Sequence, residues 1–197
     1  MNKLGVFSLA GAALVMCSSA NAAKLSAASA AEYAQGTYPE YFDLLKLPND
    51  AIVPADVRKN VEFLDAAFRK RGFVTKQLEN DGKPMLFAEQ PNADPKRKTV
   101  LFYMHLDGQP VVSEQWDQKD PWEPVLKRRT TDDKWEEVDS AKLFNGSVDP
   151  EWRVFGRSSA DDKAPIMMLL ATMDAIKANG AAQGVNVKVI LDSEEEK

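Results

Sequence analysis

The sequence has one cysteine and one histidine among its 197 residues, and this scarcity narrows the chemistry that the chain can perform. Because the cysteine, Cys17, lies close to the N-terminus, the remainder of the chain has neither a disulfide nor a thiol. The core or a bound metal must therefore stabilise it. Positive charge is also in deficit, since the formal net charge is −5. We expect no nucleic-acid partner, because binding phosphates needs a basic surface.

Long hydrophobic runs are missing as well, apart from one at the N-terminus. Leu4–Met16 is an uncharged and mostly apolar run of 13 residues, too short to cross a bilayer as a helix, so we expect no membrane span. Lys3 before the run and the small-x-small sequence 20–22 after it complete the pattern of a secretory signal. We expect cleavage after Ala22, a mature chain of residues 23–197, and a periplasmic or secreted location.

Two alternatives to a cleaved signal were weighed against this pattern. Cys17 could be a lipid attachment site, although Met16 is bulky where a lipobox has a small residue. The apolar run could instead form a buried N-terminal helix. The charged start, the apolar run and the cleavage sequence occur in the right order, which favours the signal.

The rest of the chain alternates between patterns typical of helices and of strands. Apolar residues at helical spacing predict helices at 55–71 and 162–178, and apolar runs predict strands at 98–105 and 185–191. The continuous run at 98–105 is typical of a strand that is buried on both faces. This alternation predicts an α/β fold. Three further segments are expected: one or two short helices over 32–47, a hairpin of 73–78 with 85–89, and a long surface excursion with a hairpin at 108–155.

The single histidine lies where a strand is predicted to end. His105 closes the 98–105 strand, and Asp107 follows two residues later. A neutral imidazole is a good zinc ligand, and it usually donates its second N–H to a carboxylate that fixes the ring. Asp107 is a candidate for that carboxylate. The alternative is a histidine that is hydrogen-bonded at a strand end and binds no metal.

A segment of small residues leads into the predicted 162–178 helix. Residues 156–163 read Gly-Arg-Ser-Ser-Ala-Asp-Asp-Lys, and their small side chains let the backbone turn tightly, so that Asp161 can project into a site. The alternative is a helix N-cap, where a carboxylate accepts hydrogen bonds from N–H groups of the first turn. Asp162 could cap the helix in this way while Asp161 serves another purpose.

An acidic sequence, Asp192–Glu196, follows the apolar 185–191 strand. A solvated run of charge is the usual meaning of such a sequence, and it is the alternative here. Carboxylates at the end of a buried strand, however, repel one another unless a cation compensates them. Because active groups in α/β sheets lie at the carboxyl ends of strands, the three clusters together supply the histidine, aspartate and glutamate ligands of a zinc pair.

These motifs, in this order, resemble a known family. Met104–Asp107, Gly156–Pro165 and Asp192–Glu196 are similar to the motifs of the zinc-dependent peptidases that include carnosinase, glutamate carboxypeptidase, acetylornithine deacetylase and succinyl-diaminopimelate desuccinylase. Trp122-Glu123-Pro124 resembles the dipeptidase branch. The resemblance covers about the whole mature chain and implies the N-terminal half of a mixed-sheet α/β catalytic domain over residues 23–197.

The resemblance also implies a role for each candidate residue. His105 would bind one zinc ion, and Asp107 would orient its ring. Asp161 would bridge both ions. Glu196 would bind the second ion, and Glu195 would be the general base that takes a proton from the bridging water. Cobalt or manganese could replace the two zinc ions, since similar ligands serve several metals.

The chain departs from the family in a few places. Ser158 and Ala164 stand where the family usually has glycine. The family's cis peptide, by contrast, has a counterpart here and would fall between Asp161 and Asp162. The family's further aspartate and histidine ligands, and its lid domain that mediates dimerisation, lie beyond the position of Glu196. We therefore expect a partial catalytic domain without the lid, with weak zinc affinity and very low or no turnover, and a homodimer only in a longer form.

The expected function is hydrolysis of an amide bond in a small peptide or an N-acyl amino acid by water activated between two zinc ions. The alternative, from another class, is a non-catalytic module that uses the acidic strand ends to bind a cation or a basic peptide. A downstream aspartate, lid domain and histidine would favour the enzyme.

Overall fold

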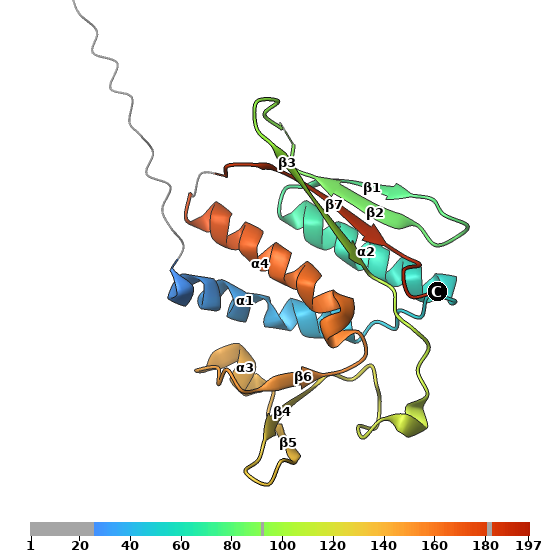
Figure 1. The fold of residues 1–197 in the computed structure, drawn as a ribbon, viewed down its shortest axis with the longest axis vertical. Coiled ribbons are helices and arrows are strands. Elements are labelled where there is room, and N and C mark those ends of the chain that lie inside the picture. Colours follow the sequence, from blue (N-terminus) through green and yellow to red (C-terminus); the bar gives the residue numbers. More distant parts are fainter. Residues whose placement is uncertain (1–25, 92, 181–182) are drawn as a thin grey trace, which may run out of the picture.

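A computed structural model describes residues 26–91, 93–180 and 183–197 of the chain, which form a four-stranded sheet, a smaller three-stranded sheet and the helices beside them (Figure 1). The predicted signal sequence and the lipid-attachment alternative at Cys17 lie outside these residues. Within the described part, no helix combines the length and the apolar character that crossing a membrane requires.

The main sheet is mixed, as the resemblance implied. Its strands are β1 (Val74–Leu78), β2 (Met85–Glu89), β3 (Thr99–His105) and β7 (Asn186–Asp192), in the order β1-β2-β7-β3. β1 and β2 form the predicted antiparallel hairpin, and β7 runs antiparallel to β2 and parallel to β3. In the hairpin turn, Asp81 and Gly82 both have positive φ, which the Asn-Asp-Gly sequence tolerates.

The predicted helices are present, with one correction. The expected 55–71 helix is α2 (Pro54–Lys70), and the 162–178 helix is α4, which begins later, at Ala164, and ends at Ala178. Instead of one or two short helices over 32–47, there is a single helix, α1 (Ala27–Leu45), that continues through Pro39. The last turns of α1 are buried in the core, and this burial outweighs the backbone hydrogen bond that proline cannot make.

One face of the main sheet carries the core. Val187, Val189 and Leu191 of β7 are buried together with Leu86 and Ala88 of β2. The same core includes the apolar faces of the helices, among them Leu44 and Leu45 of α1, Val57, Val61, Leu64 and Phe68 of α2, and Ile166, Leu170 and Met173 of α4. The alternation of buried and less buried residues along β7 therefore follows the period of two that its sequence shows.

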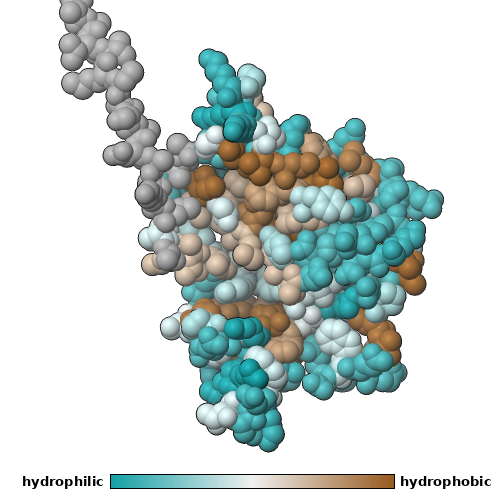
Figure 2. Space-filling view, in the orientation of Figure 1, coloured by the Kyte–Doolittle hydropathy of each residue, from teal (hydrophilic) through white to brown (hydrophobic). Residues whose placement is uncertain are grey.

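The expectation that the 98–105 strand is buried on both faces is wrong for this chain. β3 is an edge strand, and Leu101 and Tyr103 are 53% and 58% exposed. Only the last two residues, Met104 and His105, are buried. A continuous apolar run is typical of a strand covered on both faces, but within the described residues Thr99–Tyr103 are exposed and β3 has a neighbouring strand on one edge only. A hydrophobic band is correspondingly visible over this part of the sheet (Figure 2).

The 108–155 excursion contains its own small sheet. Its strands are β4 (Val125–Arg129), β5 (Trp135–Val138) and β6 (Arg153–Phe155), in the order β5-β4-β6. β4 and β5 form the hairpin that was expected, and β6 adds a third antiparallel strand. A 3-10 turn (Ser113–Gln115) and the short helix α3 (Ala141–Asn145) complete the excursion. In Figure 1, α1 lies between this small sheet and α4.

Candidate metal centre

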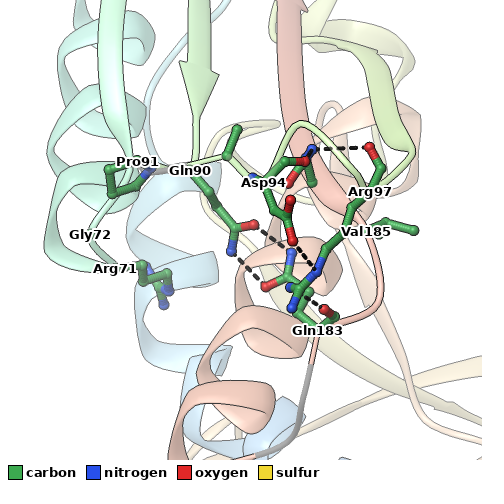
Figure 3. Close-up of a pocket in the computed structure, with 10 residues that line it drawn as sticks. Arg71, Gly72, Gln90, Pro91, Asp94, Arg97, Gln183 and Val185 are labelled. Carbon is green, nitrogen blue, oxygen red and sulfur yellow. Dashed lines mark hydrogen bonds and ion pairs between the residues drawn. The ribbon is translucent and has the colours of Figure 1, made fainter.

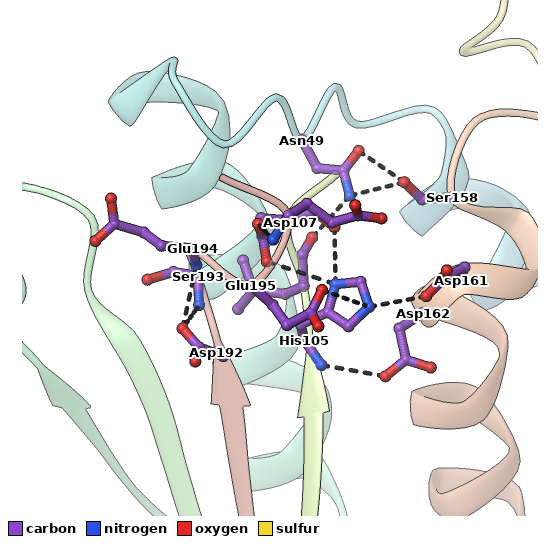
Figure 4. Close-up of polar contacts among 12 residues, drawn as sticks. Asn49, His105, Asp107, Ser158, Asp161, Asp162, Asp192, Ser193, Glu194 and Glu195 are labelled. Atoms are coloured by element: carbon purple, nitrogen blue, oxygen red, sulfur yellow. Dashed lines mark hydrogen bonds and ion pairs between the residues drawn. The ribbon is translucent and has the colours of Figure 1, made fainter. Parts of the chain in front are cut away.

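Two parallel strands bring the His105 motif and the acidic segment Asp192–Glu196 together. β3 and β7 pair in a register that sets His105 directly beside Asp192, so the segments that follow both strands leave the sheet at the same edge. The remaining motif lies between them in the sequence, and its residues 158–163 lead into α4 next to this edge. Figure 4 shows the side chains of the three motifs gathered around His105.

His105 is the centre of the arrangement. Its Nε2 lies 2.8 Å from Oδ1 of Asp161 and 3.9 Å from Oε2 of Glu195. Its Nδ1 lies 3.5 Å from Oδ1 of Asp107 and 3.2 Å from the Asp107 carbonyl oxygen. The imidazole therefore has carboxylates near both ring nitrogens, and Asp107 is where an orienting carboxylate would have to be.

Two overlapping groups of side chains could hold metal ions. His105 forms one group with Glu195 and Glu196 and another with Asp161 and Asp162, and the possible ligand atoms of each group lie within 4.8 Å of one another. The structure thus brings together all the residues that the sequence singled out. Their individual roles remain predictions.

Asp162 is a member that the sequence analysis did not assign to the site. Its Oδ2 accepts a hydrogen bond from the backbone N–H of His105 at 3.1 Å. The helix-capping alternative is wrong, because no side chain caps the N-terminus of α4 or of the 159–163 turn. The peptide bond between Asp161 and Asp162 is cis, as the resemblance implied. The only sequence signal for Asp162 was its place next to Asp161.

The end of α1 holds the segment that carries Asp161. The hydroxyl of Tyr41 donates to the carbonyl oxygen of Ser159 at 2.5 Å. The ammonium of Lys163 is fully buried and donates to the carbonyl oxygens of Leu44 and Leu47 at 2.9 and 2.7 Å. Burial lowers the pKa of Lys163 to about 7. This lysine thereby anchors the segment to carbonyl oxygens at and just after the end of α1.

A buried asparagine ties the Asp161 segment to the end of β3. Asn49 donates from Nδ2 to the carbonyl oxygen of Leu106 at 2.8 Å and to Oγ of Ser158 at 3.1 Å. Ser158 has a left-handed backbone with φ of 57°, which accounts for the glycine that the family usually has there. Gly108 completes the contact, since a Cβ at this position would lie 2.6 Å from the Ser158 hydroxyl.

The acidic segment after β7 is anchored, which argues against a freely solvated run. Oδ1 of Asp192 accepts hydrogen bonds from the N–H groups of Ser193 and Glu194 at 2.7 and 3.1 Å. The N–H of Glu196 donates to Oδ2 of Asp107 at 2.9 Å, and Ser193 is fully buried. Glu195 is the most exposed of the three glutamates, with a half-exposed side chain, and it lies beside His105.

The electrostatics of the cluster favour a cation. Burial raises the pKa of Asp107 and of Asp162. Burial lowers the pKa of His105, but its hydrogen bond to Asp161 and the charges of Asp107 and Asp162 outweigh this, so the net shift is upward. Oδ1 of Asp107 is buried and accepts no hydrogen bond from any described residue. An imidazole with several carboxylates is a ligand set that fits zinc, and the surplus of carboxylates needs positive charge.

A cavity of about 430 Å³ adjoins this centre. Its lining includes Asp161 and Glu196 together with Gln109, Trp116 and Arg157. Oε2 of Glu196 also accepts a hydrogen bond from Gln109 at 2.9 Å. The volume is within the range of small-molecule sites.

A second cavity, of about 400 Å³, lies where β7 begins, at the end of the main sheet away from the metal centre (Figure 3). Its arginines are already paired, Arg71 with Glu40 and Asp174, and Arg97 with Asp94. It also contains none of the possible metal ligands. The cavity beside His105 is therefore the better candidate for the functional site.

Several known proteins are similar to this chain. No model of a known protein family matches the chain, but individual proteins do. A Cys-Gly metallodipeptidase of Schizosaccharomyces pombe is 29% identical over 135 residues, which are 68% of this chain and 24% of that protein. A Beta-Ala-His dipeptidase of Rattus norvegicus is 31% identical over 113 residues, 57% of this chain and 18% of that protein. Most of this chain is thus similar to part of each of these metallodipeptidases.

Solved structures agree at the level of the fold. The dipeptidase Dug1p of Saccharomyces cerevisiae superimposes with a TM-score of 0.62 at 21% identity, covering 84% of this chain and 34% of that one. Human carnosine dipeptidase 1 gives the same TM-score and coverage at 20% identity. The predicted mixed α/β fold and the resemblance to the dipeptidase branch are confirmed. The chain spans about a quarter of the S. pombe homologue and about a third of the two solved chains.

Proposed function

We propose that this chain carries the metal-binding core of a metallopeptidase that hydrolyses an amide bond in a small peptide or an N-acyl amino acid. The observation that carries the proposal is the convergence of three separate segments on the single histidine, His105, with possible ligand atoms within 4.8 Å of one another. The names of the homologues support a peptidase that acts on dipeptides. This chain spans only part of each of these relatives. The proposed hydrolysis therefore refers to a whole enzyme that contains this chain.

The residues present fit two divalent ions. His105 and Glu196 would each hold one ion and Asp161 would lie between them, as the resemblance implies. Zinc fits the imidazole and carboxylate ligands best, while cobalt and manganese accept similar ligands. When bound, such ions polarise a scissile carbonyl and lower the pKa of a shared water.

The chain itself would supply the proton transfer and the orientation. The carboxylate of Glu195 is half exposed beside His105, where it can accept a proton from the attacking water and return it to the leaving amine. Asp107 would hold the imidazole of His105 through Nδ1 and so keep Nε2 available as a ligand. The adjoining cavity would take the substrate, and its polar side chains suit a peptide.

Two further proposals concern the context of the enzyme. The N-terminal pattern supports export to the periplasm or the medium, with the mature chain starting near Ala23. The resemblance supports a homodimer for a longer form that includes a lid domain.

Metal binding and turnover test the proposal separately. Zinc titration of the chain, by calorimetry and by elemental analysis after dialysis, should show binding that His105→Ala abolishes or strongly weakens. Release of free amine from Cys-Gly and β-Ala-His then measures hydrolysis. In a form that turns over, Glu195→Gln should keep its metal and lose at least about 100-fold in rate, because only proton transfer is lost. Metal binding by every available form without hydrolysis would favour the alternative, a cation-binding module.

A further inference from the structure

Lys83 is a buried lysine that contacts the acidic segment from the hairpin turn between β1 and β2. Its side chain is 8% exposed, and its ammonium forms an ion pair with Glu194 and donates to the carbonyl oxygen of Ala51 at 3.0 Å. Its own carbonyl oxygen accepts a hydrogen bond from the buried hydroxyl of Ser193 at 2.8 Å. The lysine is thus bound to the acidic segment through both its side chain and its backbone.

Glu194 is held on the side away from the metal centre. Asn80, in the same hairpin turn as Lys83, donates to its carboxylate at 2.6 Å, and Lys197 pairs with it at 2.8 Å. Figure 4 shows the side chain of Glu194 directed away from His105. Glu194 is therefore a bound structural carboxylate and is not available as a ligand.

The position of Glu194 affects its two neighbours along the chain. Glu195 is directed toward His105, with Oε2 3.9 Å from Nε2, and the N–H of Glu196 is bonded to Asp107. Three adjacent carboxylates would otherwise repel one another and could exchange places around the same cation. Binding the first of them to the hairpin leaves only the other two facing the centre.

We propose that Lys83 is a positioning residue for the metal centre, because by binding Glu194 it fixes which carboxylates of the acidic segment face His105. The part of this inference that concerns Glu195 as base and Glu196 as ligand rests on the proposed function. The part that concerns the position of the segment does not.

The chain offers a matched control, since Lys197 also pairs with Glu194 but is exposed. The test compares Lys83→Met with Lys197→Met in the metal-free protein, by NMR hydrogen exchange of two amides. These are the N–H of Glu196, bonded to Asp107, and the N–H of Leu106, bonded to the carbonyl oxygen of Asp192 at 2.8 Å. In Lys83→Met both should exchange about tenfold faster or more, and in Lys197→Met both should stay within about twofold of the parent.

Two readouts separate positioning from a general loss of stability. The N–H of Asn186, bonded to Lys98 at the other end of the sheet, should keep its exchange rate in Lys83→Met. Zinc affinity should fall by about tenfold in Lys83→Met, stay near the parent value in Lys197→Met, and recover in part in Lys83→Arg, which restores the charge. If Lys83→Met does not fold, Glu194→Gln removes the same ion pair and is expected to give the same pattern.

The outcomes distinguish this inference from the proposed function. Unchanged exchange at Glu196 and Leu106 in both Lys83→Met and Glu194→Gln would overturn the inference. Equal acceleration at Asn186 would also overturn it, because the lysine would then only stabilise the fold. A parent chain that binds no zinc, together with the expected exchange pattern, would refute the proposed function and still support the positioning of the segment.

Discussion

Replacing Asn49 by alanine should weaken the fold and the metal centre together. Its side chain is fully buried and takes part in three hydrogen bonds: to the Leu106 carbonyl at 2.8 Å, to the Ser158 hydroxyl at 3.1 Å, and from that hydroxyl at 3.2 Å. At about 1 kcal/mol of net stability each, Asn49→Ala should lower the free energy of unfolding by about 3 kcal/mol. The loss includes the cost of leaving the Leu106 carbonyl without a partner.

A second buried asparagine provides the matched control. Asn186 also takes part in three hydrogen bonds, from the N–H of Asp94 at 3.0 Å and to the carbonyl oxygens of Asp94 and Arg97 at 2.8 and 3.3 Å. It lies at the start of β7, at the end of the sheet away from His105. Asn186→Ala should therefore lower the free energy of unfolding by a similar amount, about 3 kcal/mol.

Zinc affinity should separate the two variants. Asn49 joins the end of β3 to the segment that carries Asp161, so Asn49→Ala should let these segments separate and should lower zinc affinity by about tenfold or more. Asn186→Ala should leave zinc affinity within about twofold of the parent when both are measured where the protein is folded. Urea unfolding measures the free energy of unfolding of each variant, and calorimetric titration measures its zinc affinity. Equal losses of affinity in the two variants would refute the reasoning, since stability alone would then control metal binding.

Three other predictions concern Asp161, Lys163 and the N-terminus. Asp161→Asn should lower the metal content at both positions, as measured by elemental analysis, because a neutral amide would stand between two dications. His105→Ala should mainly empty one position. Full metal content in Asp161→Asn would contradict the bridging role. The pKa of Lys163 is lowered to about 7 from its usual 10.5, so between pH 7 and 9 the unfolded chain binds a proton that the folded chain does not. The free energy of unfolding should therefore rise across this window by up to about 1.4 kcal/mol per pH unit, and Lys163→Met should remove that contribution in denaturant titrations at several pH values. Export in a bacterium with Sec secretion should yield a chain that starts at or near Ala23 by mass spectrometry, and soluble cytoplasmic protein with Met1 intact would contradict the signal.

Local patterns in the sequence were sufficient for most of the secondary structure. Helix α2 and the β1–β2 hairpin appear within one or two residues of their predicted bounds, because a helical apolar stripe and an Asn-Asp-Gly turn depend on neighbours along the chain. The prediction of one or two short helices over 32–47 was less accurate, because α1 is buried in the core and continues past Pro39 as a single helix. Such burial cannot be inferred from neighbouring residues.

By itself, the sequence determined which residues could carry the chemistry, because a lone histidine and two acidic motifs at predicted strand ends leave few other candidates. Only the tertiary structure decided what surrounds them. Asp162 reaches His105 across 57 positions, and Ser193 reaches Lys83 across 110. β3 lies at the edge of the sheet with β7 as its one neighbouring strand, and its residues Thr99–Tyr103 are exposed. Contacts across such separations depend on how the strands and helices pack, and a one-dimensional pattern does not contain that information.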